Sequence, residues 1–134
     1  MAQFADVILP LPLESTFTYS LPRDFANLVQ VGSRIIVPFG TTKSYSAIVV
    51  KLHDTMPSYA TKEAMELLDS SPIVTTAQLK LWEWIADFYL CTIGDVYKAA
   101  LPSGMKLESE SSVMYNEEYI ADAFYIFLIH FCSP

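Results

Sequence analysis

The stretch RIIVPFGTTKSYSAIVVKLH, residues 34–53, decides the fold of this chain. It holds two runs rich in β-branched and aromatic residues, 34–39 and 43–53, on either side of a short loop at residues 40–42. Such residues favour strands, and a loop this short joins strands that lie antiparallel. The stretch therefore predicts a β-hairpin, and with it an antiparallel sheet.

Two further strands are predicted on the amino-terminal side of the hairpin. Residues 4–9 form an apolar run that two following prolines end, because proline lacks the N–H that a sheet needs. Residues 16–21 alternate, with Phe17, Tyr19 and Leu21 on one face and hydroxyl-bearing residues on the other. This alternation is typical of a half-buried strand.

A helical pattern begins on the carboxyl-terminal side of the hairpin. Thr75 and Gln78 have the spacing of a capping box. In such a box, the side chain of each residue accepts a hydrogen bond from the backbone N–H of the other. Leu79 and Trp82 then continue an apolar stripe at helical spacing, and the helix is expected to end near Cys91. Trp82 is predicted to lie in the core.

A second, shorter helix is predicted over residues 95–101, and the chain carries one ambiguous segment. Residues 62–68, KEAMELL, favour a helix by composition alone. Strands that come first and helices that follow are typical of an α+β domain rather than of a parallel α/β sheet.

The charge is unevenly distributed along the sequence. The 134 residues carry a net charge of −7. Residues 1–106 hold eight basic and ten acidic side chains, a balance of −2, whereas residues 107–134 hold five acidic side chains and no basic one. A body so close to neutral cannot hold a long duplex by counterion release. Any nucleic-acid binding is therefore expected to use a small pocket.

Several classes of protein are excluded by missing motifs. The sequence has no phosphate-binding loop, dinucleotide fingerprint, nucleophile elbow or zinc-protease motif. Cys91 and Cys132 form no CxxC pair, so neither a zinc site nor a disulfide framework is expected. Cys91 is predicted to be a packed thiol and His53 a surface residue. The sequence predicts a binding or interaction module rather than an enzyme, with no cofactor and no metal.

The location was predicted from the two ends of the sequence. The first residues lack the basic region of a signal peptide. The longest apolar run, Phe124–Ile129, is far shorter than the roughly 18 residues of a membrane span. We therefore expect a cytoplasmic protein that does not enter a membrane.

A series of short motifs, each weak alone, gains specificity from its order and spacing across residues 6–104. The motifs are LPLPL at residues 9–13 with TFTY at 16–19, VGSR at 31–34 with VPFG at 37–40, AIVV at 47–50, LDSSP at 68–72, WIADFY at 84–89 and IGDV at 93–96. In this order they resemble the amino-terminal 3′-DNA-end-binding domain of the PriA (primosomal protein N′) replication-restart helicases, and most of all the Bacteroidetes-type members.

The resemblance implies a fold and a function. It implies a small β-barrel-like antiparallel sheet followed by two helices, with residues 62–68 in a strand despite their composition. It implies that the domain captures the 3′ end of a nascent leading strand, on forked or single-stranded DNA at a stalled fork. Full-length family members are ATP-dependent 3′–5′ DNA helicases that use ATP, magnesium and zinc. They reach other primosome proteins through domains that this sequence lacks.

The resemblance also implies which residues form the DNA 3′-end-binding pocket. They are Phe17, Thr18, Tyr19, Gly40 and Lys62. The family often has Asp where this sequence has Thr18. A hydroxyl can donate and accept hydrogen bonds but brings no charge, so end recognition is expected to be weaker or differently selective.

The sequence also offers other basic groups for the same pocket, and simpler structural roles for its residues. Arg34 and Lys43 are candidate helpers for the last phosphate. As alternatives, Phe17 and Tyr19 could be core residues, Gly40 a turn residue and Lys62 an ordinary solvated lysine. Trp84 was expected to pack against the barrel, with contact to a neighbouring domain as the alternative.

The sequence predicts two parts, a binding domain over residues 1–106 and a tail over 107–134. The tail is acidic and then hydrophobic, and resembles an aberrant or truncated start of the next domain. Two alternative functions remain at this stage, a protein-interaction domain and a nonfunctional fragment of the helicase, neither with DNA binding of its own.

Overall fold

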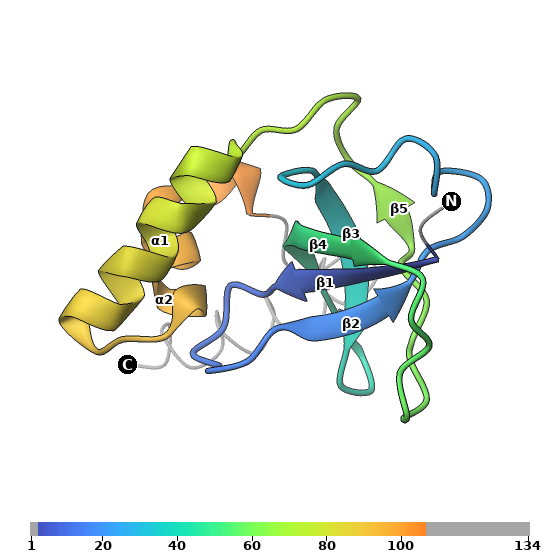
Figure 1. Cartoon of the computed structure of the whole chain (residues 1–134), viewed down its shortest axis with the longest axis horizontal. Coiled ribbons are helices and arrows are strands. Elements are labelled where there is room, and N and C mark those ends of the chain that lie inside the picture. Colours follow the sequence, from blue (N-terminus) through green and yellow to red (C-terminus); the bar gives the residue numbers. More distant parts are fainter. Residues whose placement is uncertain (1–2, 107–134) are drawn as a thin grey trace, which may run out of the picture.

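The computed structural model describes residues 3–106, so the predicted tail lies outside the described residues. Within them, a five-stranded sheet comes first and two helices follow (Figure 1). The elements are β1 (Phe4–Ile8), β2 (Phe17–Ser20), β3 (Arg34–Phe39), β4 (Lys43–His53), β5 (Glu66–Leu67), α1 (Thr76–Tyr89), α2 (Ile93–Ala100) and the short 3₁₀ helix Ser103–Met105. The strand order is β2-β1-β4-β3-β5, and neighbouring strands are antiparallel. The predicted α+β class is confirmed.

The central hairpin lies where the sequence predicts it. β3 and β4 have the predicted bounds, and their register runs from Arg34 opposite Ile48 to Phe39 opposite Lys43. β4 is the longest strand and also pairs with β1, so the hairpin provides the middle of the sheet.

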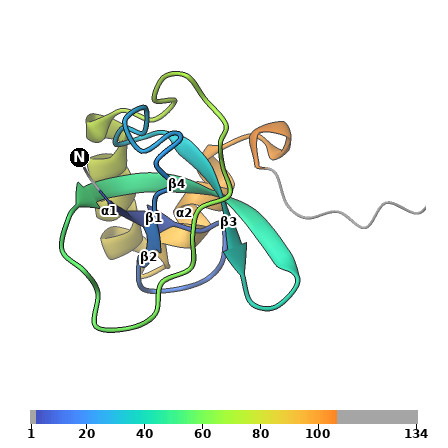
Figure 2. The ribbon, with the colours of Figure 1, turned by 90° about the vertical axis from the view of Figure 1, so that its right-hand side faces the viewer.

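The two faces of β4 contribute to two separate cores. Tyr45, Ala47 and Val49 belong to the core inside the curved sheet. Ile48, on the other face, packs in a second core with residues of α1 and α2. Figure 2 shows both helices behind the sheet, on that second face. Alternating side chains along one strand thus bury both sides of it.

The helices are fastened to the sheet through Tyr97 of α2, which is fully buried. Its hydroxyl donates to the carbonyl oxygen of Ser46 at 2.9 Å and lies 3.0 Å from Ser46 Oγ. The Tyr97 ring stacks on Trp82 of α1, with centroids 5.9 Å apart. Trp82 is therefore a core residue, as predicted.

Both helices begin at a capping box, but the sequence prediction located only one of them. The box of Thr75 and Gln78 is confirmed. Thr92 and Asp95 form a second box, so α2 begins at Ile93 and not at residue 95 as predicted. The predicted start is wrong because Gly94 does not end the preceding turn but is a buried residue inside the first turn of α2.

Residues 62–68 form less strand than the resemblance implied. Only Glu66–Leu67 pair with β3, and Glu63 forms an isolated bridge with Ser20 of β2. The segment therefore contacts both β2 and β3, but no continuous strand pairing joins these two strands. The sheet is curved but open, which is a looser arrangement than a barrel.

Arg34 forms an ion pair that holds β3 to the chain leading into α1. Its Nη2 and Nε each lie 2.7 Å from a carboxylate oxygen of Asp69, and its Nη1 donates to the carbonyl oxygen of Met105. The hydrogen bonds from Arg34 hold the pKa of the Asp69 carboxyl below its ordinary value. The expectation that Arg34 assists the pocket is therefore wrong, because its guanidinium is used here.

We expect Asp69→Asn to destabilise the fold near neutral pH and to matter less in acid. A carboxyl whose pKa is lowered by folding contributes stability above its unfolded pKa of about 4, and this contribution is lost as the pH falls through the folded pKa. Near pH 6 the loss should be about 1–3 kcal/mol in urea unfolding, and it should shrink toward pH ~2. A difference between wild type and variant that stayed constant over this range would contradict the ion pair's role.

Candidate nucleic-acid interface

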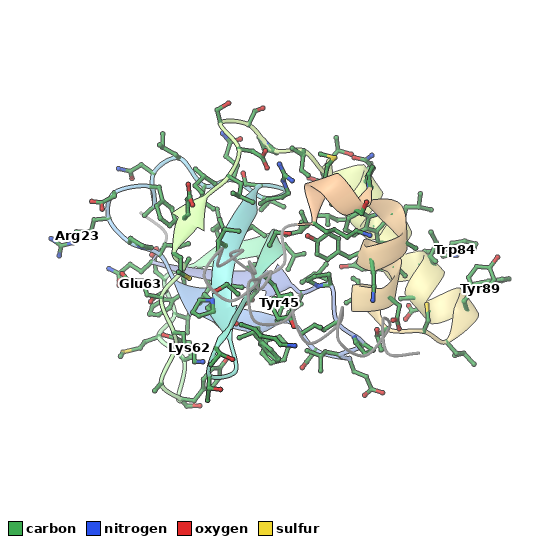
Figure 3. All side chains as sticks on the ribbon, turned by 180° about the vertical axis from the view of Figure 1, so that it is seen from behind. Arg23, Tyr45, Lys62, Glu63, Trp84 and Tyr89 are labelled. Atoms are coloured by element: carbon green, nitrogen blue, oxygen red, sulfur yellow. The ribbon has the colours of Figure 1, made fainter. Side chains whose placement is uncertain are left out.

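All five predicted site residues line one surface cavity of about 250 Å³. The cavity is formed by β2, the turn after β3 and the end of the connection between β4 and β5. Its lining residues are Phe17, Thr18, Tyr19, Pro38, Phe39, Gly40, Tyr59, Ala60, Thr61 and Lys62. Figure 3 shows the labelled Lys62 at the sheet end of the molecule, away from the labelled Trp84 and Tyr89 of α1. The volume lies just below the ~300–1,000 Å³ of typical small-molecule pockets, which suits one terminal nucleotide better than a duplex.

Lys62 is positioned by backbone hydrogen bonds to the edge strand β2. The Ser20 N–H donates to the Lys62 carbonyl oxygen at 3.0 Å, and the Ala64 N–H donates to the Ser20 carbonyl oxygen at 2.9 Å. The exposed Lys62 ammonium donates to the carbonyl oxygen of Gly40 across the cavity. An ammonium has three donors, so two remain for a ligand.

Gly40 is required by the turn and also leaves the cavity open. Its φ is +71°, a left-handed conformation that L side chains rarely adopt. No heavy atom lies within 4 Å of the place where a Cβ would stand. The turn explanation is therefore supported, and a glycine at this position adds no side chain to the cavity.

The two aromatic residues of β2 are held firmly in the cavity wall. Tyr19 is only 4% exposed, and its hydroxyl donates to the Pro38 carbonyl oxygen at 3.1 Å. Burial raises the pKa of the Tyr19 phenol, which favours its protonated, donating form. Phe17 packs edge-on against Phe39, with centroids 5.4 Å apart. Both residues belong partly to the core, which supports the structural alternative for each.

Thr18 directs its hydroxyl proton toward the sheet rather than into the cavity. Its Oγ1 donates to Asp6 Oδ1 at 2.6 Å, and the same carboxylate oxygen lies 3.2 Å from His53 Nε2. Only the acceptor capacity of the Thr18 hydroxyl remains for a ligand. His53 is stacked on Phe4 and partly buried, so its prediction as a surface residue is wrong.

The electrostatics favour this cavity over a larger one for an anionic ligand. Lys62 is charged, and the remaining lining residues include no Asp or Glu. A cavity of about 620 Å³ near the α1–α2 turn is lined by Glu14, Glu83 and Asp87, and by no Lys or Arg. Its carboxylates would repel phosphate. Lys43 is exposed at the start of β4 and does not line the smaller cavity, so its prediction as a helper is not supported.

The outer face of α1 is apolar and uncovered within the described residues. Trp84 is 57% exposed and stacks on Phe88, which is 64% exposed. The expectation that Trp84 packs against the sheet is wrong, because the helical period directs Leu79 and Trp82 inward and Trp84 outward. Cys91, predicted as a packed thiol, is exposed just beyond the end of α1.

Sequence reasoning missed one member of the cavity, Tyr59. This ring lies in the connection between β4 and β5, three residues before Lys62, and is 58% exposed. An aromatic residue in a loop, three residues before a candidate lysine, is the signal that could have identified it.

Residues 3–106 contain neither a metal site nor a membrane-spanning helix. No group of three or more His, Cys, Asp or Glu side chains there could hold a metal ion. Among the same residues, no helix is long and apolar enough to cross a bilayer.

The structure is that of a small α+β domain with a surface cavity that Lys62 lines, and sequence comparison identifies the family. Residues 6–102 match the PriA family described as "3'DNA-binding domain (3'BD)", and the chain belongs to that family.

The relatives are much longer proteins that carry the name replication restart protein PriA. The protein from Haemophilus influenzae is 32% identical over 112 residues, which cover 83% of this chain and 15% of the relative. The protein from Treponema pallidum is 28% identical over 117 residues, 84% of this chain and 18% of the relative. The protein from Bacillus subtilis is 29% identical over 114 residues, 82% of this chain and 14% of the relative. The matched family is a DNA-binding domain and not a helicase domain, and the chain spans less than a fifth of the length of these relatives.

Proposed function

We propose that this chain binds the 3′ end of nascent leading-strand DNA at stalled forks, as part of a PriA-type replication-restart helicase. The observation that carries the proposal is the convergence of Phe17, Thr18, Tyr19, Gly40 and Lys62 on one small cavity. A cavity of this size takes a chain terminus and leaves no room for a continuous duplex. The near-neutral body makes such local recognition necessary.

The groups around the cavity suit a free 3′-hydroxyl. The Gly40 carbonyl oxygen accepts from Lys62 and keeps a second lone pair for a hydroxyl proton. The two remaining donors of Lys62 suit the last phosphodiester. A terminal 3′-phosphate would bring negative charge against the carbonyl oxygen and would offer it no hydroxyl donor at that position.

The test compares forked and single-stranded DNA whose 3′ end is a hydroxyl or a phosphate, in fluorescence-anisotropy titrations. We expect the 3′-phosphate to weaken binding about tenfold, which corresponds to one lost hydrogen bond of ~1.4 kcal/mol. Adding a phosphate to the 5′ end instead is the matched control and should change little. Equal affinity for both 3′ ends would overturn end capture.

The proposal extends to cofactors, partners and location. We propose that the domain binds DNA with no cofactor, so a chelator should leave the anisotropy titration unchanged. ATP, magnesium, zinc and contacts to other primosome proteins belong to the further domains of full-length members. Such a protein acts on chromosomal DNA in the cytoplasm.

A second candidate function, a protein-interaction surface, is favoured by the exposed face of α1. Leu81, Trp84, Phe88, Tyr89 and Leu90 are each more than half exposed. An apolar face of this kind is typical of a surface that another domain or protein covers. Trp84 fluorescence tests this function, because contact with the remainder of a full-length relative should shift its emission to shorter wavelength. Unshifted emission would argue against the second function.

A further inference from the structure

Three of the four aromatic residues that line the cavity are buried or partly buried. Tyr19 is almost fully buried and its hydroxyl is engaged by Pro38. Phe17 and Phe39 are partly buried and pack edge-on against each other, and Phe39 also contacts Tyr45 with centroids 6.2 Å apart. A base entering the cavity would find little open ring surface on these three residues.

Tyr59 has the exposed ring surface that those three residues lack. It lines the same cavity, is 58% exposed, and takes part in none of the ring contacts found among residues 3–106. It lies three residues before Lys62, with only Ala60 and Thr61 between them on the same wall. A ring and an ammonium so placed can contact the base and the backbone of one nucleotide at the same time.

The connection that carries Tyr59 can adjust to a ligand. Residues 55–61 form no backbone–backbone hydrogen bond with other described residues, whereas Lys62 is fixed by Ser20 immediately afterwards. The long connection between β4 and β5, green in Figure 2, loops away from the sheet. The ring can therefore move onto a base without breaking the sheet.

We propose that Tyr59 is the stacking platform for the base of the terminal nucleotide, with the sugar and its 3′-hydroxyl directed to Gly40 and Lys62. This inference rests on the proposed function. Every base has a π face, so stacking on Tyr59 holds the terminus without selecting its sequence. The inner aromatic residues Phe17 and Tyr19 then shape the cavity wall rather than carry the base.

The test is a double-mutant cycle on the full 134-residue chain. Tyr59→Ala and wild type are titrated with a strand that ends in an ordinary nucleotide and with one that ends in an abasic 3′-hydroxyl sugar. Base–aromatic stacking corresponds to about 5- to 150-fold in affinity, so Tyr59→Ala should weaken binding of the ordinary strand at least fivefold. The same substitution should leave binding of the abasic strand within about twofold, because no stacked base remains to be lost.

Three controls sharpen the result. Tyr59→Phe keeps the ring and should bind within about twofold of wild type, because stacking needs no hydroxyl. Met56→Ala changes another exposed residue of the same connection, 83% exposed and outside the cavity, and should have no effect. A 2-aminopurine at the 3′ terminus should be quenched by wild type and not by Tyr59→Ala.

The outcomes distinguish failure of the Tyr59 proposal from failure of the proposed 3′-end binding. The proposal that Tyr59 stacks on the base would be contradicted if Tyr59→Ala lowered the affinity for ordinary and abasic strands equally. It would also be contradicted if Tyr59→Phe bound as weakly as Tyr59→Ala. An intact preference for a free 3′ end with no effect of Tyr59→Ala would overturn the platform alone. No preference for a free 3′ end in wild type would overturn the proposed function and the inference together.

Discussion

Replacing Lys62 with alanine is expected to weaken binding of a strand with a free 3′ end by about 10- to 100-fold. Hydrogen bonds that involve a charged group contribute about 1.5–3 kcal/mol, and Lys62 supplies the positive charge of the cavity lining. The salt dependence of binding should change by about one phosphate contact or less, because a single ammonium is removed. Anisotropy titrations at several salt concentrations measure both quantities.

Lys80→Ala provides the matched control for this substitution. Lys80 is an exposed lysine of α1 and does not line the cavity, so its removal changes the net charge equally. We expect it to weaken binding less than twofold. If Lys80→Ala and Lys62→Ala weakened binding to the same extent, general electrostatic attraction rather than a terminal pocket would explain the affinity.

Gly32→Ala is expected to destabilise the protein by more than about 4 kcal/mol, enough to leave little folded protein. Gly32 has a φ of +90°, where an L side chain is strained by about 1–2 kcal/mol. A Cβ there would also stand 1.8 Å from the carbonyl oxygen of Val74, so the chain entering α1 would have to move. Both effects act at the same residue.

Urea unfolding followed by circular dichroism measures this effect, with Gly104→Ala as the control. No heavy atom lies within 4 Å of the place where a Cβ on Gly104 would stand, and its φ is not positive. We expect the control to unfold within about 0.5 kcal/mol of wild type. A Gly32→Ala protein as stable as this control would show that the contact with Val74 is not tight.

Local patterns explain which parts of the fold could be predicted from the sequence. The hairpin followed from β-branched runs around a short loop, and α1 followed from the capping box at Thr75 and the stripe through Trp82. These signals lie within a few residues of one another, so no tertiary information is needed to recognise them. The second box at Thr92 is equally local, but Gly94 lies inside it, and a glycine is more often found just outside a helix.

Long-range contacts explain what could not be predicted. Arg34 was a plausible phosphate ligand until the fold brought Asp69, 35 residues away, against its guanidinium. Thr18 offered a hydroxyl to a ligand until strand pairing placed Asp6 beside it. Propensity and periodicity describe neighbours along the chain, whereas these contacts depend on which strands lie side by side. The resemblance named five residues that line one cavity in the structure, but it gave no information on Tyr59, which no motif contains.

The hydroxyl of Tyr97 buried against Ser46 has a consequence for evolution and engineering of this domain. Separating α2 from β4 would break these hydrogen bonds and expose to water the apolar core that the helices share with the sheet. The helical half therefore cannot be exchanged or deleted as an independent cassette. A destabilising substitution in α2 would therefore also lower the fraction of molecules that carry a folded cavity, because small domains usually unfold in one cooperative transition.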